Sequence, residues 1–237
     1  MSTTLGEIML PQPFLKAFPE PETVFCDPVE RYARHMNPLV SIDLSAVDPS
    51  LSGWVHLVSP IEPCDGYLGD QGSEYWGGYL QANWIGFRLN QDNRYELLGD
   101  FRFFGVENSG GKEFYRGARA DLIEMYPREH ASYLHRKHAF AETGQINLIG
   151  SDQKLREVPA LTELGGRAPT CNIVWNDSPT AAFTYAEEDG APRTRDGRLY
   201  SFIAAVPGHW YRDNGADRVI LYFDPVERIV LQTFVFT

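Results

Sequence analysis

The sequence has few cysteines and no long apolar run, and each scarcity excludes a class of protein. Three cysteines, Cys26, Cys64 and Cys171, stand in 237 residues without a CxxC spacing, which argues against a disulfide framework or a structural zinc site. The longest apolar runs, such as residues 219–223, are far shorter than the roughly 18 residues that span a bilayer, so we expect no membrane partner. The N-terminal stretch lacks a basic segment followed by an apolar core, and we therefore expect a cytoplasmic location.

Basic residues are also scarce. The chain has 21 Lys and Arg against 32 Asp and Glu, a net charge of −11, and residues 36–87 contain no Lys or Arg. Proteins that bind DNA or RNA carry a basic footprint that neutralises phosphates, so we expect no nucleic-acid partner. An acidic surface suits a basic protein partner through charge complementarity. The alternative is that the acidity only keeps the protein soluble.

The apolar pattern predicts an α+β fold with largely antiparallel sheet and a central helical insertion. Apolar residues make up 43% of the chain and aromatic residues 13%, enough to bury a core. We expect one compact domain over residues 1–237, with two sub-domains (1–110 and 145–237) joined by helices over 112–141 as the alternative. The elements predicted from periodicity and breakers are an extended arm over 1–23, helices over 29–36, 112–126 (stopped by Pro127) and 129–141, and strands over 54–58, 83–89, 95–106, 171–175, 181–186, 198–206, 218–223 and 229–236.

Residues 62–78 are the most informative stretch, because glycines there alternate with acidic and aromatic residues. A loop this long inside a compact domain is usually functional or mobile. At protein interfaces aromatic side chains supply binding area, and carboxylates pair with Arg or Lys. The alternative is a loop folded onto the domain with its aromatic side chains in the core. The residues predicted to bind a partner are Asp65, Tyr67, Asp70, Glu74, Tyr75 and Trp76.

A cluster of histidines lies in the second predicted helix. His135 and His138 are three residues apart on one helical face, a spacing that can hold a metal, whereas His130 does not readily join them. Arg136 and Lys137 raise the local positive charge, which disfavours a divalent cation. We therefore predict no metal site and no cofactor, and interpret the cluster as an exposed helix face.

His209 is the other histidine with a possible chemical role. It lies in a Gly-His-Trp-Tyr loop that is either catalytic or a turn filled by Trp210 and Tyr211, and we favour the filled turn. No recognisable catalytic set is present, so we do not predict an enzyme. The alternative function is a small hydrolase or metal-dependent enzyme that uses His209 or the pair His135 and His138.

Two segments of the C-terminal half carry a family resemblance. Residues 164–175 have the sequence LGGRAPTCNIVW, and residues 197–206 have the sequence GRLYSFIAAV. They resemble the "GG.P…W" opening and the "P-L-x-F-I-A-Q-I" strand of YwqG-like domains, with Ala205 where that family usually has Gln. Similar small acidic proteins are often encoded beside bacterial toxins as immunity partners, so the resemblance implies a bacterial binding protein. Together with the acidity, it predicts a cytosolic immunity protein that occludes a cognate toxin or effector.

Overall fold

The fold is built on two antiparallel sheets with a long helix from the middle of the chain, which confirms the predicted α+β class. A computed structural model describes residues 4–63, 66–108, 116–150, 152–175 and 178–236. The eight-stranded sheet has the order β1 (Leu5–Ile8), β10 (Leu161–Leu164), β13 (Ser201–Val206), β14 (Arg218–Asp224), β15 (Ile229–Val235), β6 (Trp84–Leu89) and β5 (Leu80–Gln81), and β7 (Tyr95–Leu97) also pairs with β6. The three-stranded sheet has the order β2 (Leu15–Ala17), β3 (Met36–Asp43) and β4 (Trp54–Pro60).

Hairpins and helices complete the fold. The hairpins are β8 (Ile146–Ile149) with β9 (Leu155–Val158), and β11 (Phe183–Ala186) with β12 (Ala191–Thr194). The α-helices are α1 (Pro21–Val24), α2 (Val29–His35) and α3 (Arg116–Thr143). Short 3-10 helices are η1 (Leu44–Ala46), η2 (Asp70–Tyr75), η3 (Phe101–Phe103) and η5 (Gly208–Trp210).

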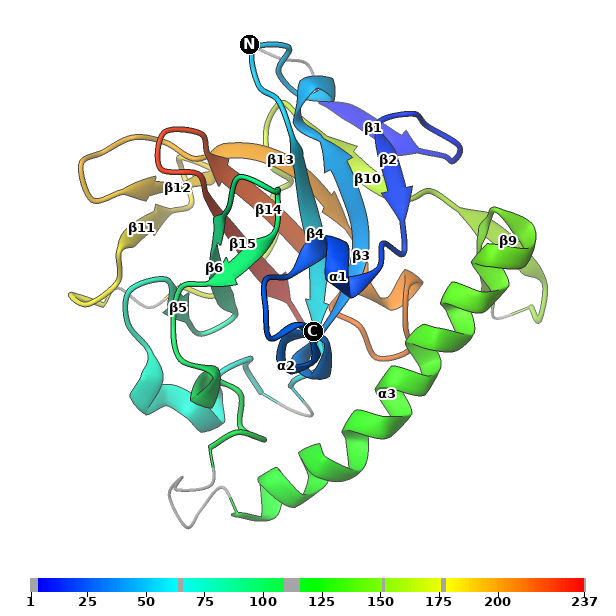
Figure 1. Cartoon of the computed structure of the whole chain (residues 1–237), viewed down its shortest axis with the longest axis horizontal. Helices are drawn as coiled ribbons and strands as arrows, with labels where there is room; N and C mark the ends of the chain where they lie inside the picture. Colours follow the sequence, from blue (N-terminus) through cyan, green and yellow to red (C-terminus); the bar gives the residue numbers. More distant parts are fainter. Residues whose placement is uncertain (1–3, 64–65, 109–115, 151, 176–177, 237) are drawn as a thin grey trace.

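Alternating apolar residues of the large sheet fill two cores, one on each face. On β14, Val219, Leu221 and Phe223 belong to the main core, which also contains residues of β3 and β4. Ile220 and Tyr222 belong to a second core that includes residues of β11 and β12. Successive residues of a strand face opposite sides of the sheet, so β14 is buried on both faces. Figure 1 shows β3 and β4 lying across β13, β14 and β15, with α3 along one side.

The two halves of the chain share the large sheet. Strands β1, β5, β6 and β7 precede α3 in the chain, and β10, β13, β14 and β15 follow it. Pairing of β15 with β6 and of β1 with β10 joins the halves directly. Residues 1–110 and 145–237 therefore contribute to one sheet, a point that the sequence left open.

Helix α3 continues through Pro127, so the predicted stop at that residue and the separate helix over 129–141 are wrong. Proline removes its own N–H and leaves the carbonyl four residues earlier, at Ile123, without its usual partner. Pro127 and Ile123 are both exposed, and water can hydrate that carbonyl. Residues 112–115 of the predicted helix lie outside the described residues. On the opposite side of α3, Leu122, Met125 and Tyr126 pack with Ile61 and Val106.

Several strand predictions also differ from the structure. The predicted strand over 95–106 ends at Leu97, because the Asp100 side chain accepts the Arg102 N–H and begins η3. Residues 171–175 form no strand; Trp84 instead donates its indole N–H to the carbonyl of Val174 (2.8 Å). Strand β3 was not predicted: its first residue, Met36, was placed at the end of a helix, and residues 37–43 were assigned to no element. The predicted arm over 1–23 contains β1, β2 and α1.

Candidate functional site

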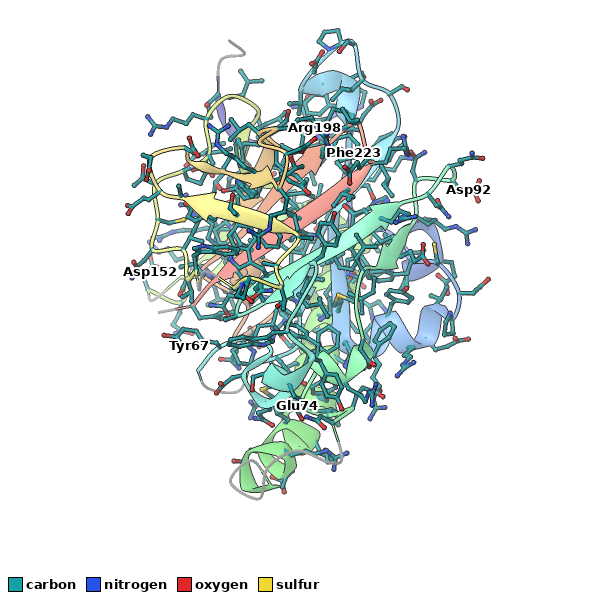
Figure 2. The ribbon with its side chains drawn as sticks, turned by 90° about the vertical axis from the view of Figure 1, so that its left-hand side faces the viewer. Tyr67, Glu74, Asp92, Asp152, Arg198 and Phe223 are labelled. Carbon is teal, nitrogen blue, oxygen red and sulfur yellow. The ribbon has the colours of Figure 1, made fainter. Side chains whose placement is uncertain are left out.

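Five of the six predicted binding residues lie on a compact turn around η2. Tyr67 is 49% exposed, Glu74 is exposed and Asp70 is half-buried, and Figure 2 shows Tyr67 and Glu74 on one side of the molecule. Tyr75 and Trp76 are partly buried and pack against the main core. Asp65 lies outside the described residues. The inner aromatic residues of this loop therefore pack on the domain, whereas Tyr67 and Glu74 are exposed to solvent, and the role of the loop in binding a partner stays a prediction.

Contacts on the inner side hold the η2 turn in place. The indole N–H of Trp76 donates to the carbonyl of Gly69 (2.8 Å), and the Leu68 N–H donates to Asn83 Oδ1 (2.8 Å). Gly69 has a φ of +81°, and a Cβ there would lie 2.1 Å from the ring of Phe103. Glycine at this position permits both the left-handed backbone and the close approach of η3. The turn is thus built by packing rather than left as a loose loop.

Glu74 on the η2 turn and Arg102 on the adjacent η3 both contact neighbouring side chains. Asn108 Nδ2 donates to Glu74 Oε1 (2.6 Å). The Arg102 guanidinium lies 4.5 Å above the ring of Tyr75, and its Nε donates to Asp100 Oδ1 (3.0 Å). Asp100 thus matches the charge of Arg102, and Asp70 and Glu74 are the acidic residues of the η2 turn itself.

The acidic segment over residues 36–87 does not form one surface. Asp43 and Asp48 precede β4 and accept N–H bonds from Ser45 and Ser50 (2.9 and 2.8 Å). Glu62 follows β4 at its other end and is 3% exposed. The run without Lys or Arg is therefore divided between the two ends of β4, and only part of it belongs to the η2 turn.

Beneath the turn, Glu62 starts a buried hydrogen-bond chain. Its carboxylate accepts the backbone N–H groups of Gly105 and Val106 (3.0 and 3.3 Å) and the hydroxyl of Tyr126 (2.9 Å). The same hydroxyl lies 2.9 Å from His35 Nδ1, and His35 Nε2 lies 3.1 Å from Glu107 Oε1. Burial raises the pKa of Glu62 and lowers the pKa of His35 to about 4. The sequence analysis did not predict this hydrogen-bond network, because its members come from four separate segments of the sequence.

The structure separates the histidines that the sequence grouped together. His130 is half-buried, and its Nε2 lies 3.0 Å from the carbonyl of Arg34, whereas His135 and His138 are exposed on α3. His135 and His209 line one cavity of about 600 Å³ together with Asp213, and His138 does not line it. Among the described residues, no group of three or more His, Cys, Asp and Glu side chains is arranged to hold a metal ion.

The turn at His209 is filled as the sequence interpretation favoured. Tyr211 is fully buried, and its hydroxyl donates to the carbonyl of Ala160 (2.9 Å). Trp210 is partly buried against the main core. His209 itself is exposed at the start of η5, and it reaches the cavity that His135 also lines.

A serine and a histidine that the sequence analysis did not single out meet on the small sheet. Ser41 Oγ lies 2.7 Å from His56 Nδ1, and both residues are 3% exposed. Each is a polar residue within a largely apolar strand, and this pattern is the feature of the sequence that could have marked the two residues as candidates. Their contact depends on the pairing of β3 with β4, which the sequence did not predict.

Comparison of the chain with protein-family models, with curated proteins and with solved structures finds no match in any of the three. The resemblance to YwqG-like domains therefore stays a prediction. Its two segments lie in the connection after β10 and in the region that leads into and includes β13. In the part of the chain that the structure describes, no helix is both long and apolar enough to cross a membrane.

Proposed function

We propose that this protein is a bacterial cytosolic immunity protein that neutralises a cognate basic toxin or effector by covering it with the η2 turn. One observation carries the proposal: Tyr67 and Glu74 are exposed, and Asp70 is half-buried, on a turn that is fixed from its inner side, in a chain of net charge −11. A turn already held in one conformation loses little conformational entropy when it binds. An acidic turn of this kind suits a partner rich in Arg and Lys.

The residues of the turn would have three roles: charge, contact area and support. Asp70 and Glu74 carry the charge that attracts a basic partner, and Tyr67 supplies exposed aromatic area for the contact. Tyr75 and Trp76 keep the turn in place by packing on the core and, for Trp76, by its bond to Gly69. Asp65 is included among the proposed contact residues because it precedes Tyr67 by two positions in the sequence.

Removing the charge of the turn tests the proposal. The partner is the toxic protein that the wild-type chain captures from its native host and whose toxicity it relieves on co-expression. We expect Asp70→Asn with Glu74→Gln to lower the association rate about tenfold at low salt and to flatten its salt dependence, because steering acts on association. The dissociation rate should change little. Surface plasmon resonance at two salt concentrations measures both rates.

Glu7→Gln with Glu142→Gln is the matched control, since both side chains are exposed and lie on β1 and on the last turn of α3, which Figure 1 shows away from η2. This control should retain most of the wild-type association rate. Equal losses in the two double variants would mean that net charge alone attracts the partner and that the η2 turn is not the contact surface. A captured protein whose toxicity is not relieved would contradict the immunity function itself.

A small hydrolase is the second candidate, favoured by the cavity that His135 and His209 share. Arg136 in the same cavity donates to Asp213 Oδ1 (2.8 Å), which leaves both histidines beside an ion pair. Stoichiometric zinc, manganese or iron in the purified protein, lost in His135→Ala and His209→Ala, would favour this candidate over the immunity protein.

A further inference from the structure

A row of three polar side chains crosses the small sheet from β2 to β4. Lys16 is the register partner of Ser41, and Ser41 is the register partner of His56. Residues directly opposite each other in an antiparallel sheet project from the same face. The strand neighbours Val40 and Ile42 belong to the main core on the other face. The topology therefore brings an ammonium, a hydroxyl and an imidazole together.

The imidazole of His56 determines the direction of its bond with Ser41. His56 Nε2 lies 2.7 Å from the backbone oxygen of Asn93, and a carbonyl oxygen can only accept, so Nε2 carries a proton. Burial lowers the pKa of His56 to about 4, which keeps the ring neutral at pH 7. Nδ1 is then an acceptor, and the Ser41 hydroxyl donates to it over 2.7 Å. A base in this position takes the proton of a nucleophilic serine.

Further contacts fix His56 in this orientation. Its backbone N–H donates to the Tyr95 hydroxyl (2.6 Å), which in turn donates to the His56 carbonyl (2.7 Å). Gln232 Nε2 donates to the same carbonyl (3.1 Å). Asn93 presents its carbonyl to the imidazole from a left-handed backbone with a φ of +59°. The base and the group that orients it are thus both held in place before any ligand binds.

Ser41 and His56 open onto a cavity of about 330 Å³. The volume is at the lower end of the range for small-molecule sites. Lys16 also lines the cavity, with its Nζ 3.9 Å above the ring of Trp54. The acidic groups that line it, Glu20 and Asp92, are paired with Lys137 and Arg94 outside the row. Such a cavity suits a small, uncharged ligand.

We propose that Ser41 is a nucleophile and His56 its general base in the hydrolysis of small uncharged carboxylic esters. Ser41 Oγ attacks the ester carbonyl and forms an Oγ–C bond, while its proton passes to His56 Nδ1. The Lys16 ammonium stabilises the negative oxygen of the tetrahedral intermediate. The ester C–O bond then breaks, and the leaving alkoxide takes the proton from Nδ1. Water, deprotonated by the same nitrogen, attacks the acyl carbon, releases the acid and returns the proton to Ser41.

Covalent labelling tests this activity on the intact protein, independently of any partner. A small alkyl fluorophosphonate should add to Ser41 as the P–F bond breaks and fluoride leaves. Peptide mass spectrometry locates the adduct. We expect no adduct at this position in Ser41→Ala, and labelling about 100-fold slower or more in His56→Gln, because a positioned base contributes about that factor. Release of p-nitrophenol from p-nitrophenyl acetate should fall in parallel.

Ser59→Ala is the matched control, since Ser59 is a fully buried serine on the same strand as His56 and its hydroxyl has no hydrogen-bond partner among the described residues. This variant should label like the wild type. Circular dichroism establishes that each variant is folded, and if His56→Gln is not, the comparison of wild type with Ser41→Ala still decides. A folded wild-type protein without an adduct on Ser41, or equal ester hydrolysis in Ser41→Ala, would overturn the proposal.

Discussion

The hydroxyl of Tyr126 links two buried polar side chains that are distant in the sequence. It lies between the carboxylate of Glu62 and the imidazole of His35, at 2.9 Å from each, and all three side chains are buried. Through Glu62 the same hydroxyl reaches the backbone N–H groups of Gly105 and Val106. The polar chain therefore fastens α3 to the segments before η2 and after η3.

Without the Tyr126 hydroxyl, the buried Glu62 carboxylate and His35 imidazole each lose one hydrogen-bond partner. We expect Tyr126→Phe to lower the free energy of unfolding by about 1–3 kcal/mol, the cost of buried polar groups that lose a hydrogen bond. Urea denaturation measures the change. Tyr67→Phe removes an exposed hydroxyl and should stay within about 0.5 kcal/mol of the wild type. Equal effects of the two substitutions would show that the buried chain contributes nothing to stability.

At the scale of elements, a buried ion pair joins α3 to the strands. Arg212 and Glu129 are each 1% exposed, with Nη1 and Oε2 2.7 Å apart. Arg212 Nη2 also donates to the carbonyls of Pro60 and Ile61, at the end of β4 (2.6 and 3.2 Å). The helix thus docks through a paired charge as well as through its apolar side.

Breaking one side of this pair should cost more than removing both. Arg212→Met removes the buried cation and leaves the Glu129 carboxylate with only the largely exposed Arg128 as an ion partner (Nε–Oε1 3.2 Å), and we expect a loss of about 3–5 kcal/mol in unfolding free energy. Adding Glu129→Leu should restore a large part of that loss. Arg136→Met breaks the more exposed pair with Asp213 and should cost about 0–1 kcal/mol. Thermal and urea unfolding measure all three variants, and a double variant less stable than Arg212→Met would contradict this account.

At the scale of the whole molecule, two buried neutral histidines make the free energy of unfolding decrease at acid pH. Burial lowers the pKa of His35 and of His56, the latter to about 4. The charged groups around them are Arg31, Arg34 and Glu107 at His35, and Lys16, Glu20 and Asp92 at His56. The unfolded chain binds protons at both histidines below about pH 6.5, whereas the folded chain does not until about pH 4. Stability is therefore fully present above pH 6.5 and falls as the pH drops toward 4.

We expect His56 alone to account for at most about 3 kcal/mol of that fall, from about 1.4 kcal/mol per unit of pKa difference. Glu62 acts in the opposite direction, because its raised pKa makes the folded chain bind a proton more readily than the unfolded one. Urea unfolding between pH 7 and pH 4.5 measures the slope. His56→Gln should flatten it, and His138→Gln, at an exposed histidine, should not. An unchanged slope in His56→Gln would rule out a neutral His56.

The sequence by itself determined the features that depend on neighbouring residues. Alternating apolar residues predicted the strands that became β4, β6, β14 and β15, and the glycine-rich acidic stretch marked the region of the η2 turn. Tertiary structure decided what depends on partners distant in the chain. Helix α3 passes through Pro127 because packing on one side and solvent on the other tolerate the missing N–H. Strand pairing brings Lys16, Ser41 and His56 into one row, and the fold buries Glu62 beneath Tyr126 while it leaves Glu74 at the surface. Residue type and local spacing do not predict these contacts, because the contacts form only when segments far apart in the chain pack together.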